Sequence, residues 1–202
     1  MTTIGAMVLA AGGSVRFGSP KQLAVLGGRP LLEYPCIAMS AVCSLDRRVV
    51  VLGADAPRIA GAVDPHGADV VVCTSWADGL AASLAAGLEA LGDVDAAAIL
   101  LGDQPLVTAE VLAMVIEAAS GPWPAARATF AGAPGHPVVL RRPLFGHVRG
   151  LRGDRGAGQL LSTVEVTSVE VAHLCRDLDV DSRADLRAAE DILVGREGFE
   201  PP

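Results

Sequence analysis

IGAMVLAAGGSVRFGSPKQL, residues 4–23, joins a short apolar run to a loop rich in glycine. The apolar run predicts a strand buried on both faces of a sheet. Gly12 and Gly13 then allow the backbone to approach a ligand closely and to direct N–H groups at it, and Arg16 and Lys21 add positive charge. In open α/β sheets ligands bind beyond the carboxyl ends of the strands. The stretch therefore predicts an α/β fold with phosphate bound at the end of its first strand.

Apolar runs alternate with amphipathic stretches along the first half of the chain. This order predicts a parallel sheet with helices on both faces. Asp78 and Thr108 are the expected N-caps of two of the helices. We expect strands at 4–10, 47–53, 68–73 and 95–103, and helices at 30–42, 56–63, 78–91 and 108–119.

The second half is less regular. Its strand-like runs lie at 126–132, 136–142 and 164–172, and the last alternates with period two, which is typical of a half-exposed strand. A helix is expected at 182–193, where Ser182 and Asp185 fit a capping box. No repeat or linker divides the chain, so we expect one domain over 1–194 and a disordered tail at 195–202.

Composition narrows the class of protein. The 202 residues are 51% hydrophobic but only 3% aromatic, so the core is built from small aliphatic side chains. A net charge of -7 argues against a general nucleic-acid binder but leaves a nucleotide ligand open. The N-terminal run is too short and lacks the basic flank of a signal peptide, and no run has spanning length, so we expect a cytoplasmic protein without membrane contact. The dispersed histidines and cysteines indicate no zinc site, and the cysteines are expected to be reduced: Cys36, Cys43, Cys73 and Cys175.

Three kinds of phosphate loop compete for residues 9–23. The dinucleotide pattern G-x-G-x-x-G is absent. The P-loop pattern is missed because Ser19 and Pro20 precede Lys21, and Pro20 disfavours helical geometry at Ser19. The third pattern, L-A-A-G-x-S-x-R-x-G-x-x-K-x-L, is matched at every fixed position.

With that loop the chain resembles the MobA-like nucleoside-triphosphate transferases, and among them most closely the molybdenum cofactor cytidylyltransferases. The resemblance covers roughly residues 4–193. It implies a single-domain, Rossmann-like three-layer sandwich with a mostly parallel sheet, of the nucleotide-diphospho-sugar transferase type. It also implies CTP rather than GTP as substrate, because residues 10–12 read A-A-G. The nucleotide-binding residues that it implies are Leu9, Ala10, Ala11, Gly12, Gly13, Ser14, Arg16, Lys21, Gly79, Ser83 and Asp103.

Asp103 follows a very apolar strand in LLGDQP, residues 100–105. A carboxylate there needs a partner or a cation, and Mg²⁺ is normally held by one or two carboxylates together with substrate phosphates. The alternative is a turn cap before Pro105. The resemblance makes Asp103 a magnesium ligand and Asp181 of DVDSRADL, residues 179–186, a second one, with Asp179 a weaker candidate. Ser182 and Asp185 also allow a plain helix cap in that segment.

The acceptor side is expected around GHP, which is Gly135, His136 and Pro137, together with Gln104 and Pro105. His136 fits a hydrogen bond to the incoming substrate, although histidines in turns are often merely solvated. The segment GDRGAGQLL, residues 153–161, resembles a family pattern with arginine at the position of Gly158, and Arg155 is the cation nearest to it in sequence.

The resemblance implies transfer of CMP from CTP to the phosphate of molybdopterin, with Lys21, Arg16 and Asp103 as catalytic residues and Mg²⁺ as cofactor. A molybdoenzyme or its accessory protein is an implied partner. An ionised phosphate needs no general base, so catalysis reduces to positioning and charge neutralisation. Two rival hypotheses stay open: a nucleotidyltransferase for a sugar phosphate or alcohol phosphate, or one that uses GTP, and a non-catalytic protein that delivers the cofactor. Binding alone does not require Asp103 beside Lys21, which favours an enzyme.

Overall fold

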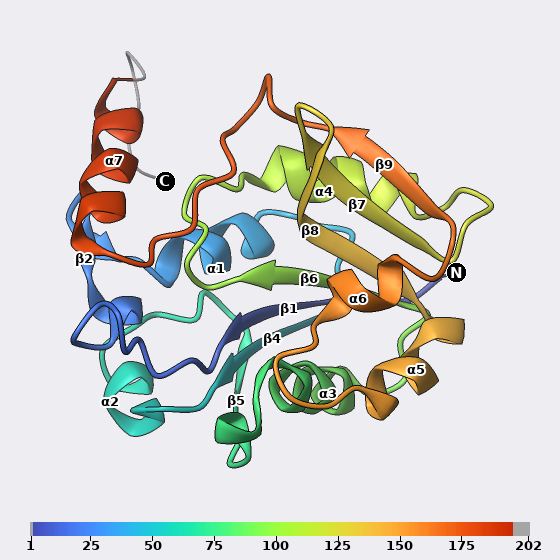
Figure 1. Ribbon diagram of the computed structural model, residues 1–202, viewed down its shortest axis with the longest axis horizontal. Helices are drawn as coiled ribbons and strands as arrows, with labels where there is room; N and C mark the ends of the chain where they lie inside the picture. The colour runs from blue at the N-terminus through green and yellow to red at the C-terminus, as the bar shows by residue number, and fades with distance from the viewer. Residues whose placement is uncertain (1, 196–202) are drawn as a thin grey trace.

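A seven-stranded sheet in the order β5-β4-β1-β6-β8-β7-β9 forms the centre of the computed structural model, which describes residues 2–195 (Figure 1). The pairs β4–β5, β1–β4, β1–β6 and β7–β9 are parallel, and β8 is antiparallel to both of its neighbours. A two-stranded hairpin, β2–β3, stands apart. The strands are β1 (Ile4–Ala10), β2 (Val25–Leu26), β3 (Arg29–Pro30), β4 (Arg47–Leu52), β5 (Asp69–Val72), β6 (Ala96–Leu101), β7 (Ala125–Phe130), β8 (Ala133–Arg141) and β9 (Val166–Glu170).

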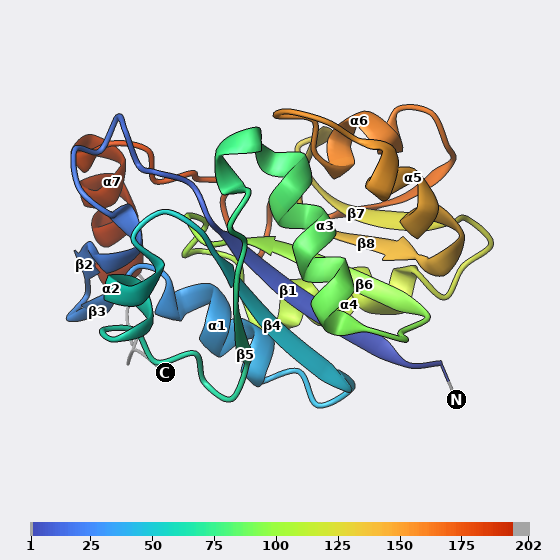
Figure 2. The same cartoon turned by 90° about the horizontal axis from the view of Figure 1, so that it is seen from below.

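Helices cover both faces of the sheet (Figures 1 and 2). One core lies between the sheet and α1, α2 and α4, and the other lies between the sheet and α3, α5 and α6. A third cluster joins α7 to the segment that follows β1. The helices are α1 (Glu33–Ser40), α2 (Ala56–Ala60), α3 (Leu80–Leu91), α4 (Ala109–Ala118), α5 (Phe145–Gly150), α6 (Ala157–Leu161) and α7 (Arg183–Val194), with 3₁₀ turns η1 (Lys21–Leu23), η2 (Trp76–Asp78) and η3 (Arg142–Leu144).

Small side chains let α3 lie close to β1. Met7 and Leu9 of β1 face the α3 side, and a Cβ at Gly87 of α3 would lie 2.5 Å from the sulfur of Met7. The alternating side chains of the same strand, such as Val8, face α1 and α4. The two-sided burial expected for the first strand is therefore confirmed, as is the α/β class with a mostly parallel sheet.

The expected helices and strands are all present, with ends shifted by a few residues. Thr108 caps α4 by accepting from the amide of Val111, and Ser182 with Asp185 forms the expected capping box of α7. The expected cap at Asp78 is wrong. Asp78 ends the 3₁₀ turn η2, and Gly79, at φ 105°, begins α3 without any side-chain cap.

Three further expectations concern the whole chain. Within residues 2–195, Cys36, Cys43 and Cys73 are free thiols, as expected. No helix within residues 2–195 has the length and apolar character that crossing a membrane requires. Of the predicted tail, only Gly195 is described, as the C-cap of α7, and 196–202 lie outside the described residues.

Candidate active site

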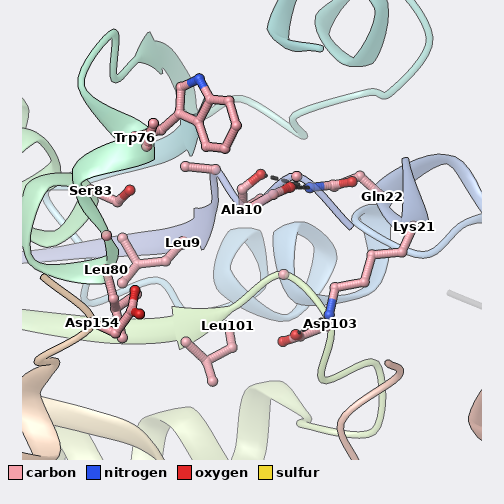
Figure 3. A pocket seen from close by; sticks show the side chains of 16 residues that line it. Leu9, Ala10, Lys21, Gln22, Trp76, Leu80, Ser83, Leu101, Asp103 and Asp154 are labelled. Atoms are coloured by element: carbon pink, nitrogen blue, oxygen red, sulfur yellow. Dashed lines mark hydrogen bonds and ion pairs between the residues drawn. The ribbon is translucent and has the colours of Figure 1, made fainter. Parts of the chain in front are cut away.

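A pocket of about 460 Å³ opens on the α3 side of the sheet, beyond the carboxyl ends of β1 and β6 (Figure 3). It contains most of the residues predicted to bind nucleotide, brought together from four separate segments. Ser14 and Arg16 do not line it. The predicted residues that line it are Leu9, Ala10, Ala11, Gly12, Gly13, Lys21, Gly79, Ser83 and Asp103.

Gln22 fixes the loop that follows β1. Its side chain is 3% exposed, and its amide nitrogen Nε2 donates to the carbonyl oxygens of Ala10, at 2.9 Å, and of Gly12, at 3.1 Å. Ser14 closes the same loop, since its hydroxyl accepts from the Lys21 amide at 3.1 Å and donates to the Gln22 Oε1 at 3.2 Å. Ser14 therefore shapes the loop in this structure. Sequence reasoning missed Gln22, although it is adjacent to Lys21.

Lys21 lies between two carboxylates. Its ammonium Nζ is 2.7 Å from Asp103 Oδ2 and 2.8 Å from Asp181 Oδ1. Burial lowers the pKa of Lys21, but the charges of Asp103 and Asp181 and their hydrogen bonds outweigh it, so the pKa lies above its ordinary value. Arg16 reaches the other oxygen of Asp181 at 2.9 Å, with a side chain that is 79% exposed. The predicted catalytic residues thus form one charged cluster.

The two predicted metal ligands converge on a single point. Oxygens of Asp103 and Asp181 both lie within hydrogen-bonding distance of one cationic atom, and carboxylate oxygens are ligands that Mg²⁺ prefers. Within residues 2–195 no group of three or more histidine, cysteine, aspartate or glutamate side chains is placed to hold a metal. Two carboxylates fit a magnesium ion that completes its coordination with water and substrate phosphates.

The capping alternatives are resolved by the hydrogen bonds. The Asp185 carboxylate accepts from the amide of Asp181, at 3.2 Å, and from the amide and hydroxyl of Ser182, at 2.8 and 2.7 Å. The cap thus uses Ser182 and Asp185 and leaves the Asp181 carboxylate to Lys21. The Val180 amide donates to the backbone carbonyl of Asp103 at 2.9 Å, which holds this segment against the end of β6.

Gln104 and Pro105 are buried and lie outside the pocket lining. The Gln104 side chain, 4% exposed, donates from Nε2 to Asp179 Oδ1 at 2.8 Å and to Asp177 Oδ1 at 3.2 Å. Burial raises the pKa of Asp179, and the hydrogen bond from Gln104 opposes that rise. In this structure, Gln104 and Asp179 therefore tie the segment before α7 to the end of β6.

The GHP residues lie on β8, outside the pocket lining but next to it. The pairing of β6 with β8 ends at Ile99 and Val138, and His136 lies two residues beyond it, toward the end of the sheet at which the pocket opens. His136 is half-buried, and burial lowers the pKa of its imidazole to about 4. At neutral pH His136 is a neutral hydrogen-bonding group beside the pocket.

The lowered pKa of His136 predicts an acid-sensitive fold. The unfolded chain, with a histidine pKa near 6.5, binds a proton that the folded chain excludes until about pH 4. The free energy of unfolding should therefore fall between these values as the pH drops, by a His136 contribution on the order of 3 kcal/mol. Urea titrations across this range should show a shallower loss in His136→Asn. Parallel curves for the two proteins would contradict the prediction.

The lining residues that sequence reasoning missed include Trp76, Leu80 and Asp154 (Figure 3). Trp76, 36% exposed, packs over two glycines. A Cβ added at Gly13 would lie 3.4 Å from the indole ring, and a Cβ added at Gly53 would lie 2.5 Å from the Cβ of Trp76. The chain has two tryptophans, and the rarity of this large aromatic side chain was the feature of the sequence that could have marked Trp76 as a site residue.

Asp154 enters the pocket through a close backbone contact with Gly79. A Cβ at Gly79 would lie 2.3 Å from the carbonyl carbon of Gly153, and the Ala81 amide donates to the Gly153 carbonyl at 3.0 Å. Glycine is therefore required at position 79 both by this contact and by its positive φ. This loop contact between distant segments has no signal in the sequence.

Comparisons with known proteins agree with this geometry. The family model described as MobA-like NTP transferase domain matches residues 6–171. The bifunctional protein GlmU of Gluconacetobacter diazotrophicus is 37% identical over 118 residues, 57% of this chain and 24% of that protein. The chain thus spans about a quarter of the curated relatives that it matches, which cover 24% to 26% of their own length.

Among solved structures, Rv0371c from Mycobacterium tuberculosis H37Rv superposes with a TM-score of 0.83 at 32% identity, over 94% of this chain and 98% of that one. A structure of Rv0371C in complex with manganese, from the same organism, gives a TM-score of 0.78 at 29% identity, over 94% and 99% of the two chains. More distant structures confirm the expected nucleotide-diphospho-sugar transferase type of fold.

Proposed function

The chain belongs to the MobA-like NTP transferase family, and we propose that it transfers CMP from CTP to the terminal phosphate of molybdopterin. The observation that carries the proposal is the Lys21 ammonium held between Asp103 and Asp181 at the mouth of a glycine-lined pocket. A phosphate oxygen of the acceptor forms a bond to the α-phosphorus of CTP, the bond from that phosphorus to the bridging oxygen breaks, and pyrophosphate leaves.

Each residue of the cluster has a charge role. The backbone amides of Gly12 and Gly13 bind the triphosphate, and Lys21 and Arg16 offset the charge that develops on the leaving pyrophosphate. Asp103 and Asp181 would hold Mg²⁺, which neutralises phosphate charge when bound. The manganese complex of the similar protein Rv0371C supports a divalent metal ion as cofactor. No general base is required, because the attacking phosphate is already ionised.

The choice of CTP rests on residues 10–12, where Ala11 lines the pocket. A side chain at that position narrows the space for a nucleobase, and a single methyl group is worth about 1–3 kcal/mol in discrimination. Release of pyrophosphate, measured with each of the four triphosphates with and without molybdopterin, tests the proposal. We expect release only with CTP and molybdopterin together. Release with a sugar phosphate or alcohol phosphate, or with GTP, would support the rival transferase hypothesis.

Nucleotide binding should change the fluorescence of Trp76, because its indole lines the pocket. Trp123 precedes the first residue of β7, at the end of that strand that points away from the pocket. The chain has two tryptophans, so Trp123→Phe leaves Trp76 as the only fluorescent reporter of this kind. We expect CTP with Mg²⁺ to quench this variant in a saturable titration. The matched variant Trp76→Phe should show no quenching. If no triphosphate changes the Trp76 emission, the delivery-protein hypothesis gains support.

A further inference from the structure

Arg127 on β7 extends from the sheet face on which the pocket opens. Side chains two residues apart on a strand share a face, and Ala125 packs in the core beneath α6. Ala126 and Ala128 pack in the opposite core. Since β8 is antiparallel to both β6 and β7, β7 runs in the same direction as β6. Arg127 is therefore nearer than Ala125 to the edge of the sheet where the pocket lies.

The guanidinium of Arg127 lacks a partner within residues 2–195. Its Nε is buried without a hydrogen bond, and no ion pair or hydrogen bond of its other nitrogens is present among the described residues. Arg48, which is also half-buried, by contrast donates to the carbonyl oxygens of Met39 and Val42. Burial lowers the pKa of Arg127. A half-buried cation without a counterion is unfavourable, so an anion from outside the chain would stabilise it.

Strand pairing relates the position of Arg127 to the residues that line the pocket. Leu9 pairs with Leu101 across β1 and β6, and both line the pocket. Ile99, two residues before Leu101 on β6, pairs with Val138 of β8, and Val138 pairs with Arg127 of β7 on the next strand. Neighbouring strands are about 4.8 Å apart, so the backbones of Ile99 and Arg127 are roughly 10 Å apart across the sheet, and Leu101 lies two residues, about 7 Å, further along β6. The charges of Asp103 and Arg127 both act on the imidazole of His136, so both side chains lie near it.

We propose that Arg127 binds an anionic group of the acceptor that is separate from the phosphate that reacts beside Lys21 and Asp103. This inference rests on the proposed nucleotidyl transfer and narrows its acceptor to a phosphorylated molecule that carries a second anionic group. The neutral His136 is near both Asp103 and Arg127, and it can form a hydrogen bond to the acceptor without repelling Arg127.

The first test is independent of transfer activity. Protein saturated with CTP and Mg²⁺, which occupy the Lys21 cluster, is titrated with inorganic phosphate while the melting temperature is followed. We expect a saturable rise in the wild type and a phosphate affinity lower by about tenfold or more in Arg127→Gln, the loss of a charge-assisted hydrogen bond. The matched control Arg141→Gln, an exposed arginine at the other end of β8, should behave as the wild type. No rise in the wild type, or an equal rise in Arg127→Gln, overturns the proposal.

The second test uses transfer to molybdopterin. Arg127→Gln should raise the KM for molybdopterin by about tenfold or more and leave the KM for CTP unchanged. Arg127→Lys should restore part of the loss. A merely structural role predicts a lower melting temperature for the free variant, whereas a binding role predicts an unchanged or higher one, because an unpaired charge is removed. If the proposed function is wrong, the wild type releases no pyrophosphate with molybdopterin. The phosphate titration, which needs no transfer activity, then still decides whether Arg127 binds an anion.

Discussion

Asp103→Asn is expected to lower the rate of pyrophosphate release by about 10²–10³-fold while the protein stays folded. The asparagine keeps the shape of the side chain but removes the charge that faces Lys21 and the proposed metal. Lys21 retains its second carboxylate, Asp181, at 2.8 Å, so the charged cluster is not left without a counterion. The loss should appear mainly in kcat, because charge at the reacting phosphate develops in the transition state.

The matched control is Asp93→Asn, which removes an aspartate charge from a side chain that is 92% exposed and pairs with Arg142 far from the pocket. Its rate of pyrophosphate release should equal that of the wild type. Circular dichroism and melting temperature check that both variants are folded. Turnover of Asp103→Asn within a few fold of the wild type would refute the assignment of Asp103 to the reaction.

Much of the fold was predictable because buried parallel strands have a local signature. The runs at 4–10, 47–53 and 95–103 have apolar centres, and each contains a strand within a residue or two of its expected ends. The short helices α5 and α6 were missed, since five or six residues carry too little periodicity to be recognised. The cap at Asp78 failed because Gly79 adopts a positive φ where it meets the backbone of Gly153, a contact between residues 74 positions apart in the sequence.

In the candidate site too, residues in local motifs were predictable and residues whose role depends on tertiary contacts were not. Lys21, Asp103 and Asp181 belong to local motifs, and the structure brings them together across separations of 82 and 160 residues. Gln104 was expected on the acceptor side, yet its amide is used to hold Asp177 and Asp179. Whether a polar side chain near a motif faces a ligand or its own chain depends on tertiary contacts. A single sequence does not encode these in any short pattern.

Lys21→Ala is expected to lower pyrophosphate release by a similar factor, about 10²–10³-fold, but for a different reason. The variant keeps both carboxylates and removes the cation that lies between them. Lys21→Arg should recover only part of the rate, because a planar guanidinium does not reproduce a compact ammonium held by two oxygens. Full activity in Lys21→Ala would contradict the role of Lys21.

The two variants should differ in how they bind a divalent cation. In the structure the Lys21 ammonium occupies the point on which Asp103 and Asp181 converge, so it competes with any second cation there. Titration with Mn²⁺ in the absence of nucleotide should therefore show tighter binding to Lys21→Ala than to the wild type, and weaker binding to Asp103→Asn. Removal of Lys21 also leaves two like charges facing each other, which should lower the melting temperature until Mn²⁺ is added. Equal Mn²⁺ affinity in all three proteins would show that Asp103 and Asp181 do not bind the metal and serve only as partners of Lys21.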